Sequence, residues 1–356
     1  MKDQFISPFG LKIDPMRQLI LIPFEKDPDT FYNQFEVQLA VLPDGTNKIA
    51  VVAYKVNGSA DVYHQQGYPL ASQSSILNEP AIIETSFVSG VFTFSPSALD
   101  LSVSFRDVHG RTIRIEISES ERKGKVPFTL LAPIGVISEK PLSLPVYYMY
   151  KMSFARKKHS NIIITVDGRS HKPDTFFLPI DKSRNYFTRY SPDSFNVDIN
   201  PAFNGPLQIS DTRNKSTLEI GDVHYELEQN NGHPEIRKIF VQRDEHLFAI
   251  EFSPSFPNML ALKNNVFLTG NISITSDAGA GEIKGSYQIG NNQNEIHIKL
   301  HPELGWIPGE RRLLLRMMFK LVKIFKDWPK TYMWDAKITR DENGRYFMNS
   351  NWVRMI

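Results

Sequence analysis

LDLSVSFRDVHGRTIRIEI, residues 99 to 117, decides the fold class, because its apolar residues alternate with polar ones. The apolar positions are Leu99, Leu101, Val103 and Phe105 before the turn and Ile113, Ile115 and Ile117 after it. A period of two is that of a β-strand with one buried face. The turn contains Gly110, which can adopt the positive φ that a tight reversal needs. The stretch therefore predicts an antiparallel hairpin.

The same alternation recurs along the chain. Further strands are predicted at residues 35–42, 48–56, 161–167, 217–228, 236–242, 247–252, 271–275, 283–289 and 295–300. Turn-forming clusters separate them at 43–45, 230–234, 278–281 and 290–294. Many short strands joined by such turns predict a mainly β protein built from antiparallel barrels or sandwiches.

The length of the chain favours two domains, since 356 residues exceed what one ordinary hydrophobic core encloses. Residues 191–206 contain three prolines among Asn, Asp and Ser, which predicts a linker rather than a central strand. We therefore expect β domains at residues 1–195 and 196–356. Short repeats, FSPS at 94–97 and 252–255 and NIIITVDG at 161–168 against NISITSDAG at 271–279, have different offsets and leave a duplication open.

The composition excludes several classes of protein. The chain has no cysteine, which removes disulfide scaffolds, thiolate metal sites and cysteine nucleophiles. A formal charge of only +2 gives no general attraction to nucleic acid. The first residues are interrupted by Pro8, Gly10 and Pro15, and no apolar run reaches the roughly 18 residues of a spanning helix. We expect a cytoplasmic protein without a cofactor, and the oligomeric state is open.

One stretch, GERRLLLRMMFKLVKIFKDWP at 309–329, predicts an amphipathic helix at residues 310–327. Its cations form a stripe of roughly 120°, so that about two-thirds of the helix surface is apolar. The favoured interpretation is that this wide apolar side packs against a sheet. The alternative is an interfacial helix that contacts anionic lipid. Because so wide an apolar surface is normally covered, we expect the intact protein not to bind lipid vesicles.

Two polar clusters are candidates for chemistry. His297 and His301 lie on one face of a predicted strand, but residues four apart are about 13 Å apart, so one ion cannot join them and no metal site is predicted. Glu226 and Glu228 are about 7 Å apart on one strand face, a carboxylate separation that occurs in glycosidases.

All four tryptophans lie near the C-terminus, at Trp306, Trp328, Trp334 and Trp352. They could stack on sugar rings or line an apolar pocket, but large aromatic side chains are more often buried in the core. A structural role is therefore favoured.

Residues 147–181, YYMYKMSFARKKHSNIIITVDGRSHKPDTFFLPID, resemble the middle of the tandem lipocalin-like family that includes the carotenoid hydratases (hydroxyneurosporene synthases). The matching residues are Tyr148, Tyr150, Ile164, Val166, Asp167, Gly168 and, with a one-residue shift, Asp181. The family's glycine and tryptophan are replaced around Phe176, and the second acid of its acidic pair is absent, since Lys182 follows Asp181. The resemblance implies two lipocalin-like β-barrel domains with an apolar cavity more strongly than it implies the reaction.

These observations lead to three hypotheses. The first is non-catalytic binding or carrying of an apolar or amphipathic small molecule, a lipid or isoprenoid, in a β-barrel cavity. Its expected ligand-binding residues are Tyr148, Tyr150, Phe176, Trp306 and Trp334. The second is a lyase or isomerase acting on an isoprenoid or lipid with Asp181 as the acid. The third is a carbohydrate-binding or carbohydrate-active β-sandwich that uses Glu226 or Glu228.

Overall fold

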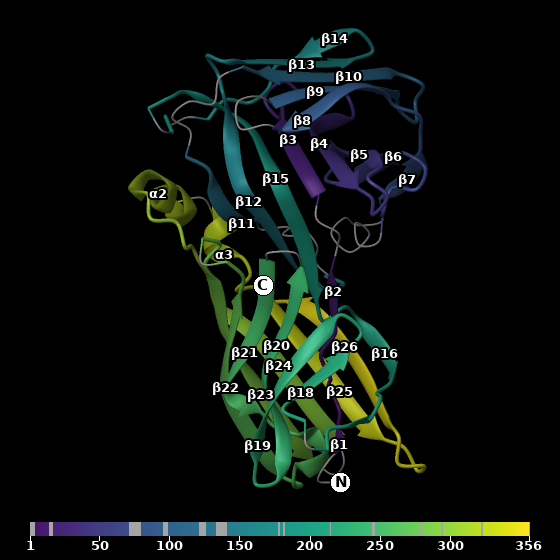
Figure 1. The fold of residues 1–356 in the computed structure, drawn as a ribbon, viewed down its shortest axis with the longest axis vertical. Coiled ribbons are helices and arrows are strands. Elements are labelled where there is room, and N and C mark those ends of the chain that lie inside the picture. Colours follow the sequence, from purple (N-terminus) through teal and green to yellow (C-terminus); the bar gives the residue numbers. More distant parts are fainter. Residues whose placement is uncertain are drawn as a thin grey trace. The chain divides into compact units, whose positions relative to one another are not determined.

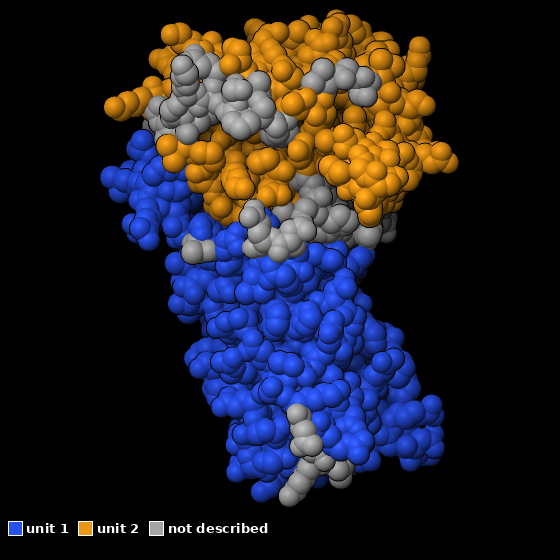
Figure 2. All heavy atoms as spheres, viewed as in Figure 1, with its two compact units in different colours: residues 1–13, 131–146, 197–356 blue, residues 14–130, 147–196 orange. Residues whose placement is uncertain are grey.

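The computed structural model describes residues 4–13, 17–70, 80–94, 99–120, 126–132, 141–176, 179–180, 182–213, 215–243, 246–277, 279–292, 295–321 and 323–355. It is mainly β, with 64% strand and 5% helix, which confirms the mainly β, antiparallel class. Two compact units are coloured in Figure 2. Unit 1 comprises residues 1–13, 131–146 and 197–356, and unit 2 comprises residues 14–130 and 147–196. The N-terminal residues and the segment 131–146 thus belong with the C-terminal half, so neither unit is a continuous stretch of chain.

Unit 2 is a sandwich of two sheets (Figure 1). The smaller sheet has the order β14 (Arg169–His171), β13 (Ser160–Val166), β10 (Thr112–Glu119), β9 (Leu99–Arg106) and β8 (Val88–Phe94). The larger has the order β11 (Phe128–Ala132), β12 (Leu144–Arg156), β15 (Asn185–Ile199), β3 (Arg17–Pro23), β4 (Tyr32–Val41), β5 (Asn47–Lys55), β6 (Ala60–His64) and β7 (Ala81–Glu84). One end each of β11, β12 and β15 belongs to unit 1, where β2 (Leu11–Ile13) pairs with residues 197–199 of β15. One hydrophobic core lies between the sheets, with β3 to β6 on one side and β9, β10 and β13 on the other.

The predicted hairpin is confirmed as β9 and β10 of this sandwich. Its register runs from Thr112 opposite Arg106 to Glu119 opposite Leu99, and Gly110 in the turn has a φ of +75°. The alternating apolar side chains are all buried in the core, because one pleat face of both strands points at the opposite sheet.

The predicted linker at 191–206 is wrong over its first part, because β15 continues to Ile199 in the middle of the larger sheet. The pairing of β15 with β3 shifts by one residue between Ser191 and Ser194. Pro192 lies inside this β-bulge, where a missing N–H costs no regular ladder bond. A bulge therefore lets a proline occupy a central strand.

Unit 1 contains a curved ten-stranded antiparallel sheet (Figure 1). Its order is β16 (Phe203–Pro206), β26 (Tyr346–Arg354), β25 (Tyr332–Arg340), β24 (Glu295–Ile307), β23 (Glu282–Asn292), β22 (Val266–Thr275), β21 (His246–Phe256), β20 (His233–Arg243), β19 (Val223–Asn230) and β18 (Thr217–Ile220). The unit also contains the strand pair β1 (Gln4–Phe5) and β17 (Ser210–Asp211) and the short 3₁₀-helix η1 (Met259–Ala261). The single strand predicted at 217–228 is in fact the hairpin β18–β19, which reverses at Gly221 with a φ of +60°.

The N-terminal segment fills the buried face of this sheet. Phe9 packs against Phe252, Phe256 and Trp334, with ring centroids 5.2, 4.8 and 5.8 Å away. Phe9 is 6% exposed, and its carbonyl oxygen accepts a hydrogen bond from the hydroxyl of Tyr225. Phe9 thus covers part of this face of the sheet with an aromatic side chain of the chain itself.

The predicted helix at 310–327 is present as α2 (Leu313–Leu321) and α3 (Lys323–Asp327), with residue 322 outside the described residues. Leu315, Met318 and Phe319 are buried, as core packing requires. The expectation that the whole apolar side packs against a sheet is wrong, because other apolar residues of α2 are exposed. These are Leu313 (71%), Leu314 (50%), Met317 (47%) and Leu321 (72%).

Candidate functional site

The tyrosines expected to bind a ligand belong to a packed stack in unit 2. Tyr148 and Tyr150 lie two residues apart on β12, and their rings are nearly parallel with centroids 5.9 Å apart. Phe195 of β15 stacks on both, at 5.1 Å from Tyr148 and 5.7 Å from Tyr150. Both tyrosines are at most 2% exposed. Their ring surfaces are therefore already covered by protein.

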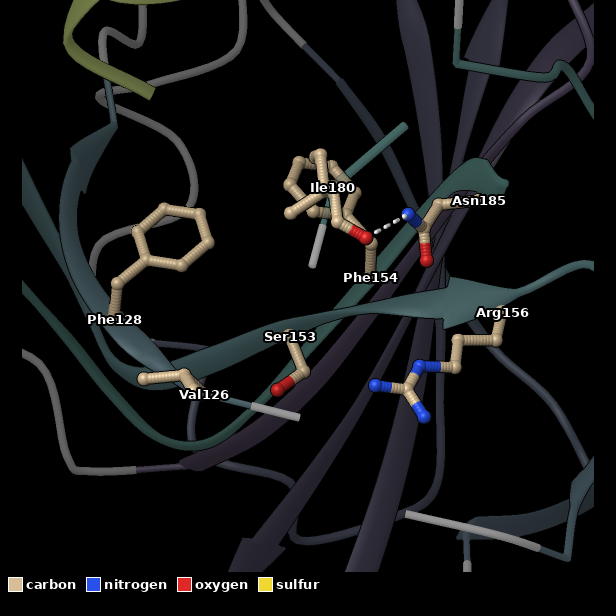
Figure 3. Close-up of a pocket in the computed structure, with 7 residues that line it drawn as sticks. All are labelled: Val126, Phe128, Ser153, Phe154, Arg156, Ile180 and Asn185. Carbon is tan, nitrogen blue, oxygen red and sulfur yellow. Dashed lines mark hydrogen bonds between the residues drawn. The ribbon is translucent and has the colours of Figure 1, made fainter. Parts of the chain in front are cut away.

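Phe176 packs with Phe154, at 5.5 Å between ring centroids, and with Phe187, at 4.8 Å. A small pocket lies beside Phe154 and is shown in Figure 3. Phe128 and Ile180 line it together with Arg156, and the amide of Asn185 donates to the carbonyl oxygen of Ile180. Its volume is about 20 Å³, which suffices for one water molecule and not for a ligand. Asp181 lies outside the described residues.

The two tryptophans expected at a ligand site belong to unit 1, where they have separate surroundings. The indole of Trp306 donates to the carbonyl oxygen of Ala280 at 2.8 Å, and its ring packs against Phe319 and Phe325. Trp334 is 0% exposed and packs against Phe9. The five predicted ligand-binding residues therefore divide between the two units.

The tryptophans and acids considered for carbohydrate binding already have partners within the protein. All four tryptophans are at most 7% exposed, so none presents a ring face to a sugar. Glu226 forms an ion pair with Arg237, and Glu228 accepts a hydrogen bond from the hydroxyl of Ser255. Within the described ranges, no group of three His, Asp or Glu side chains could hold a metal ion.

A cleft of about 880 Å³ in unit 2 is the candidate site. It is lined by residues 84–88, where the chain passes from β7 in one sheet to β8 in the other, by the end of β9 at residues 104–106, and by Lys48, Gln65, Gln66 and Thr112. Ligand pockets have volumes of roughly 300 to 1,000 Å³. The edge of the sandwich therefore has room for a small molecule without a closed barrel.

The cleft is amphipathic. Its apolar surface comes from Phe87, which is partly buried, and from Val88, which is 77% exposed. The ring of Phe105 lies beneath, 5.2 Å from that of Phe87 between centroids, and at 3% exposure it belongs to the core. Lys48 and Arg106 contribute cations, and Glu84 is the single acid in the described lining. Arg106 donates to the carbonyl oxygen of Gly110, and Lys48 forms no ion pair with a described residue.

The position of Gln65 adds a fixed polar group to this cleft. Its side-chain oxygen accepts a hydrogen bond from the backbone N–H of Ile49 at 2.8 Å. The amide nitrogen of the same side chain is a donor. The lining thus combines an apolar surface with cations and an oriented amide, the mixture that places an amphipathic molecule in one orientation.

A polar network of buried side chains lies near the β9–β10 turn of the sandwich. The hydroxyls of Tyr32 and Tyr63 are 2.9 Å apart, and Tyr63 accepts from the backbone N–H of Val108. Asp61 forms an ion pair with Lys55 at 2.6 Å. Burial raises the pKa of Tyr63 to about 12, and burial together with the neighbouring Tyr63 raises the pKa of Tyr32 further. Both phenols are neutral at physiological pH, so they are poor bases or nucleophiles.

Arg111 connects this network to two carboxylates. Its guanidinium lies 2.9 Å from an oxygen of Asp29 and 2.8 Å from an oxygen of Asp107, and it stacks over the rings of Phe31 and Tyr32. The arrangement ties the β9–β10 turn to the segment before β4. We interpret it as structural, since every charged group is satisfied within it.

Sequence reasoning missed the cleft because its lining comes from segments that have no motif. Residues 81–84 form a short strand that pairs in parallel with β6, and no alternation in the sequence marks it. The amphipathic character arises only where β5, β7 and β9 meet in space.

No family model, curated protein or solved structure matches the chain. The resemblance to the carotenoid hydratase family therefore stays a prediction. Among the described helices, none is both long enough and apolar enough to cross a bilayer.

Proposed function

We propose that this protein binds an amphipathic small molecule, such as a lipid or isoprenoid with a polar end, in the cleft at the edge of unit 2. The observation that carries the proposal is the cleft of about 880 Å³, whose lining combines the apolar Phe87 and Val88 with polar and cationic side chains. An apolar chain would cover Phe87 and Val88, and its polar end would meet Lys48 and the amide of Gln65. Binding and carrying, rather than catalysis, is the function that this lining supports.

Burial of apolar surface and hydrogen bonding contribute different amounts to the free energy of binding. Covering about 150 Å² of apolar surface contributes about 4 kcal/mol. A charge-assisted hydrogen bond from Lys48 adds about 1.5 to 3 kcal/mol. The sum of about 5.5 to 7 kcal/mol corresponds to a Kd of roughly 10 to 100 μM, and the costs of association offset part of it, so a Kd between about 100 μM and 1 mM is expected. A purely apolar molecule loses the polar contribution and is expected to bind more weakly.

The test is a titration of the full chain with a fluorescent long-chain fatty acid, followed by displacement with unlabelled lipids and isoprenoid alcohols. Ser104→Trp places a large side chain in the cleft and is expected to weaken binding at least about tenfold. Ser102→Trp is the matched control, because Ser102 lies on the same strand two residues away and outside the cleft lining. Lys48→Met is expected to weaken an anionic ligand and to leave a neutral one unchanged.

Equal binding by the wild type and the Ser104→Trp variant would refute the cleft as the site. Circular dichroism on each variant shows whether the sandwich is intact. Binding that Ser102→Trp and Ser104→Trp reduce equally would place the ligand elsewhere on the sheet.

A further inference from the structure

Helix α2 has two apolar sides, and only one of them is used for packing. At 100° per residue, the buried residues Leu315, Met318 and Phe319 span about 100° of the helix surface. Phe319 lies 5.0 Å from the ring of Trp306 and 5.1 Å from that of Phe325, measured between centroids. This aromatic group fixes the helix to β24 of unit 1.

The exposed apolar side is continuous along the helix. Leu313, Met317 and Leu321 follow one another at intervals of four residues, and Leu314 widens the row to about 100°. These four side chains, which we call the exposed row, are between 47% and 72% accessible. Single exposed apolar residues are common, but an aligned row on one helix marks a site of interaction.

Cations border the exposed row. Arg316 and Lys320 are exposed and fall within about 60° of Leu313 on the helix surface. Neither forms an ion pair with a residue that the structure describes. The nine residues of α2 include no acid, and the carboxylate of Glu310, three residues before Leu313, is paired with Arg312.

We propose that the exposed row of α2 docks on an anionic lipid surface, with Leu313, Met317 and Leu321 in the acyl boundary and Arg316 and Lys320 at the headgroups. Interfacial helices have this combination of large aliphatic side chains and adjacent cations. The charges select the occupant. In a symmetric dimer through the same row, the cations of each copy would face those of the other, whereas acidic headgroups pair with them.

This inference reverses the expectation that the intact protein does not bind vesicles. That expectation assumed that the helix must undock before its apolar residues become available. The exposed row is accessible while Leu315, Met318 and Phe319 stay packed, so no undocking is needed. The inference uses residues of unit 1 and does not depend on the cleft of unit 2.

The experiment is flotation of the full chain with vesicles of phosphatidylcholine, with and without phosphatidylglycerol, at low and high salt. The wild type is expected to float with the anionic vesicles and to be released by salt, because screening weakens the contribution of exposed cations. The triple variant Leu313→Gln, Met317→Gln, Leu321→Gln is expected to bind at least about tenfold more weakly. Arg316→Gln is expected to weaken binding about fivefold.

Phe267→Gln is the matched control, since Phe267 is 65% exposed on β22 of the same unit and outside the exposed row. It is expected to bind like the wild type. No flotation of the wild type, or equal flotation of the wild type and the triple variant, overturns the proposal. A wild-type dimer in sedimentation that the triple variant converts to monomer, without lipid binding by either, also overturns it and assigns the row to a second copy.

Discussion

Replacing Arg111 with methionine tests how much the polar network stabilises the sandwich. The guanidinium is the shared partner of Asp29 and Asp107, whose side chains are 7% and 0% exposed. Removing it leaves two buried carboxylates without a counter-charge. Loss of one partner from a buried ion pair typically lowers the free energy of unfolding by about 3 to 5 kcal/mol. Arg111 itself is 18% exposed, so water relieves part of the cost, and methionine retains part of the packing on Phe31 and Tyr32. We expect a loss of about 3 kcal/mol in the free energy of unfolding.

The measurement is urea or thermal unfolding followed by far-ultraviolet circular dichroism. For a unit of 150 to 250 residues, a loss of about 3 kcal/mol corresponds to a fall in Tm of about 6 to 12 °C. Arg114→Met is the matched control on the same hairpin, because Arg114 is 57% exposed and pairs with Glu116 on the surface. Its expected effect is below about 1 kcal/mol.

A double variant separates loss of the cation from loss of packing. Asp29→Asn in the Arg111→Met background removes one orphaned charge, so it is expected to restore part of the lost stability, whereas alone it destabilises. A loss of less than about 1 kcal/mol for Arg111→Met, or two variants that add without coupling, would refute the reasoning that these charges stabilise one another.

Three further predictions concern other parts of the chain. Burial opposes ionisation of Asp29, but hydrogen bonds from Phe31 and Arg111 outweigh it and lower the pKa of this carboxyl group. Asp29 therefore stabilises the fold at pH values above its ordinary pKa of about 3.9, and this contribution is lost as the pH falls through the lowered pKa. The stability difference between the wild type and Asp29→Asn should therefore vanish in acid-titrated unfolding, and a constant difference would contradict the assignment. Gly285→Ala places a Cβ 2.1 Å from the carbonyl oxygen of His301, so it is expected to lower the free energy of unfolding by more than about 2 kcal/mol. In the control Gly290→Ala, the nearest atom to the new Cβ is 3.4 Å away, so the free energy of unfolding should change by about 1 kcal/mol or less. Urea unfolding measures both. Phe9→Ala should lower the free energy of unfolding of unit 1 by about 3 to 5 kcal/mol. Tryptophan fluorescence follows this transition, because all four tryptophans lie in unit 1. An unshifted midpoint would show that the N-terminal segment does not stabilise the sheet.

Local patterns predicted the elements that depend on local causes. The hairpin from Leu99 to Glu119 follows from alternation and from one glycine, so the sequence shows it directly. Residues 191–199 were predicted as part of a linker, but they belong to β15. The bulge that accommodates Pro192 depends on the register of β15 against β3, which the sequence of β15 alone does not show. The N-terminal segment belongs to unit 1 because Phe9 fits against Trp334, a contact across more than 300 residues that periodicity cannot express.

The candidate site was the harder part to predict. Tyr148 and Trp334 illustrate the difficulty, because an aromatic ring uses the same surface to bind a ligand as to pack in a core. Both rings are buried against other side chains of the protein. The cleft near Phe87 and Lys48 has no local signature. Helix α2 shows the same limit, because its amphipathic pattern predicts the helix but not which part of its apolar surface has a partner.

The N-terminal segment of unit 1 is synthesised long before the strands against which it packs. All residues of unit 2 have been made once position 196 is reached, whereas Phe9 waits until β25 with Trp334 has been translated. At typical elongation rates this interval is roughly 20 to 60 s. During it, Phe5 and Phe9 lack the strands against which they pack in the native fold, so these apolar side chains are available to chaperones.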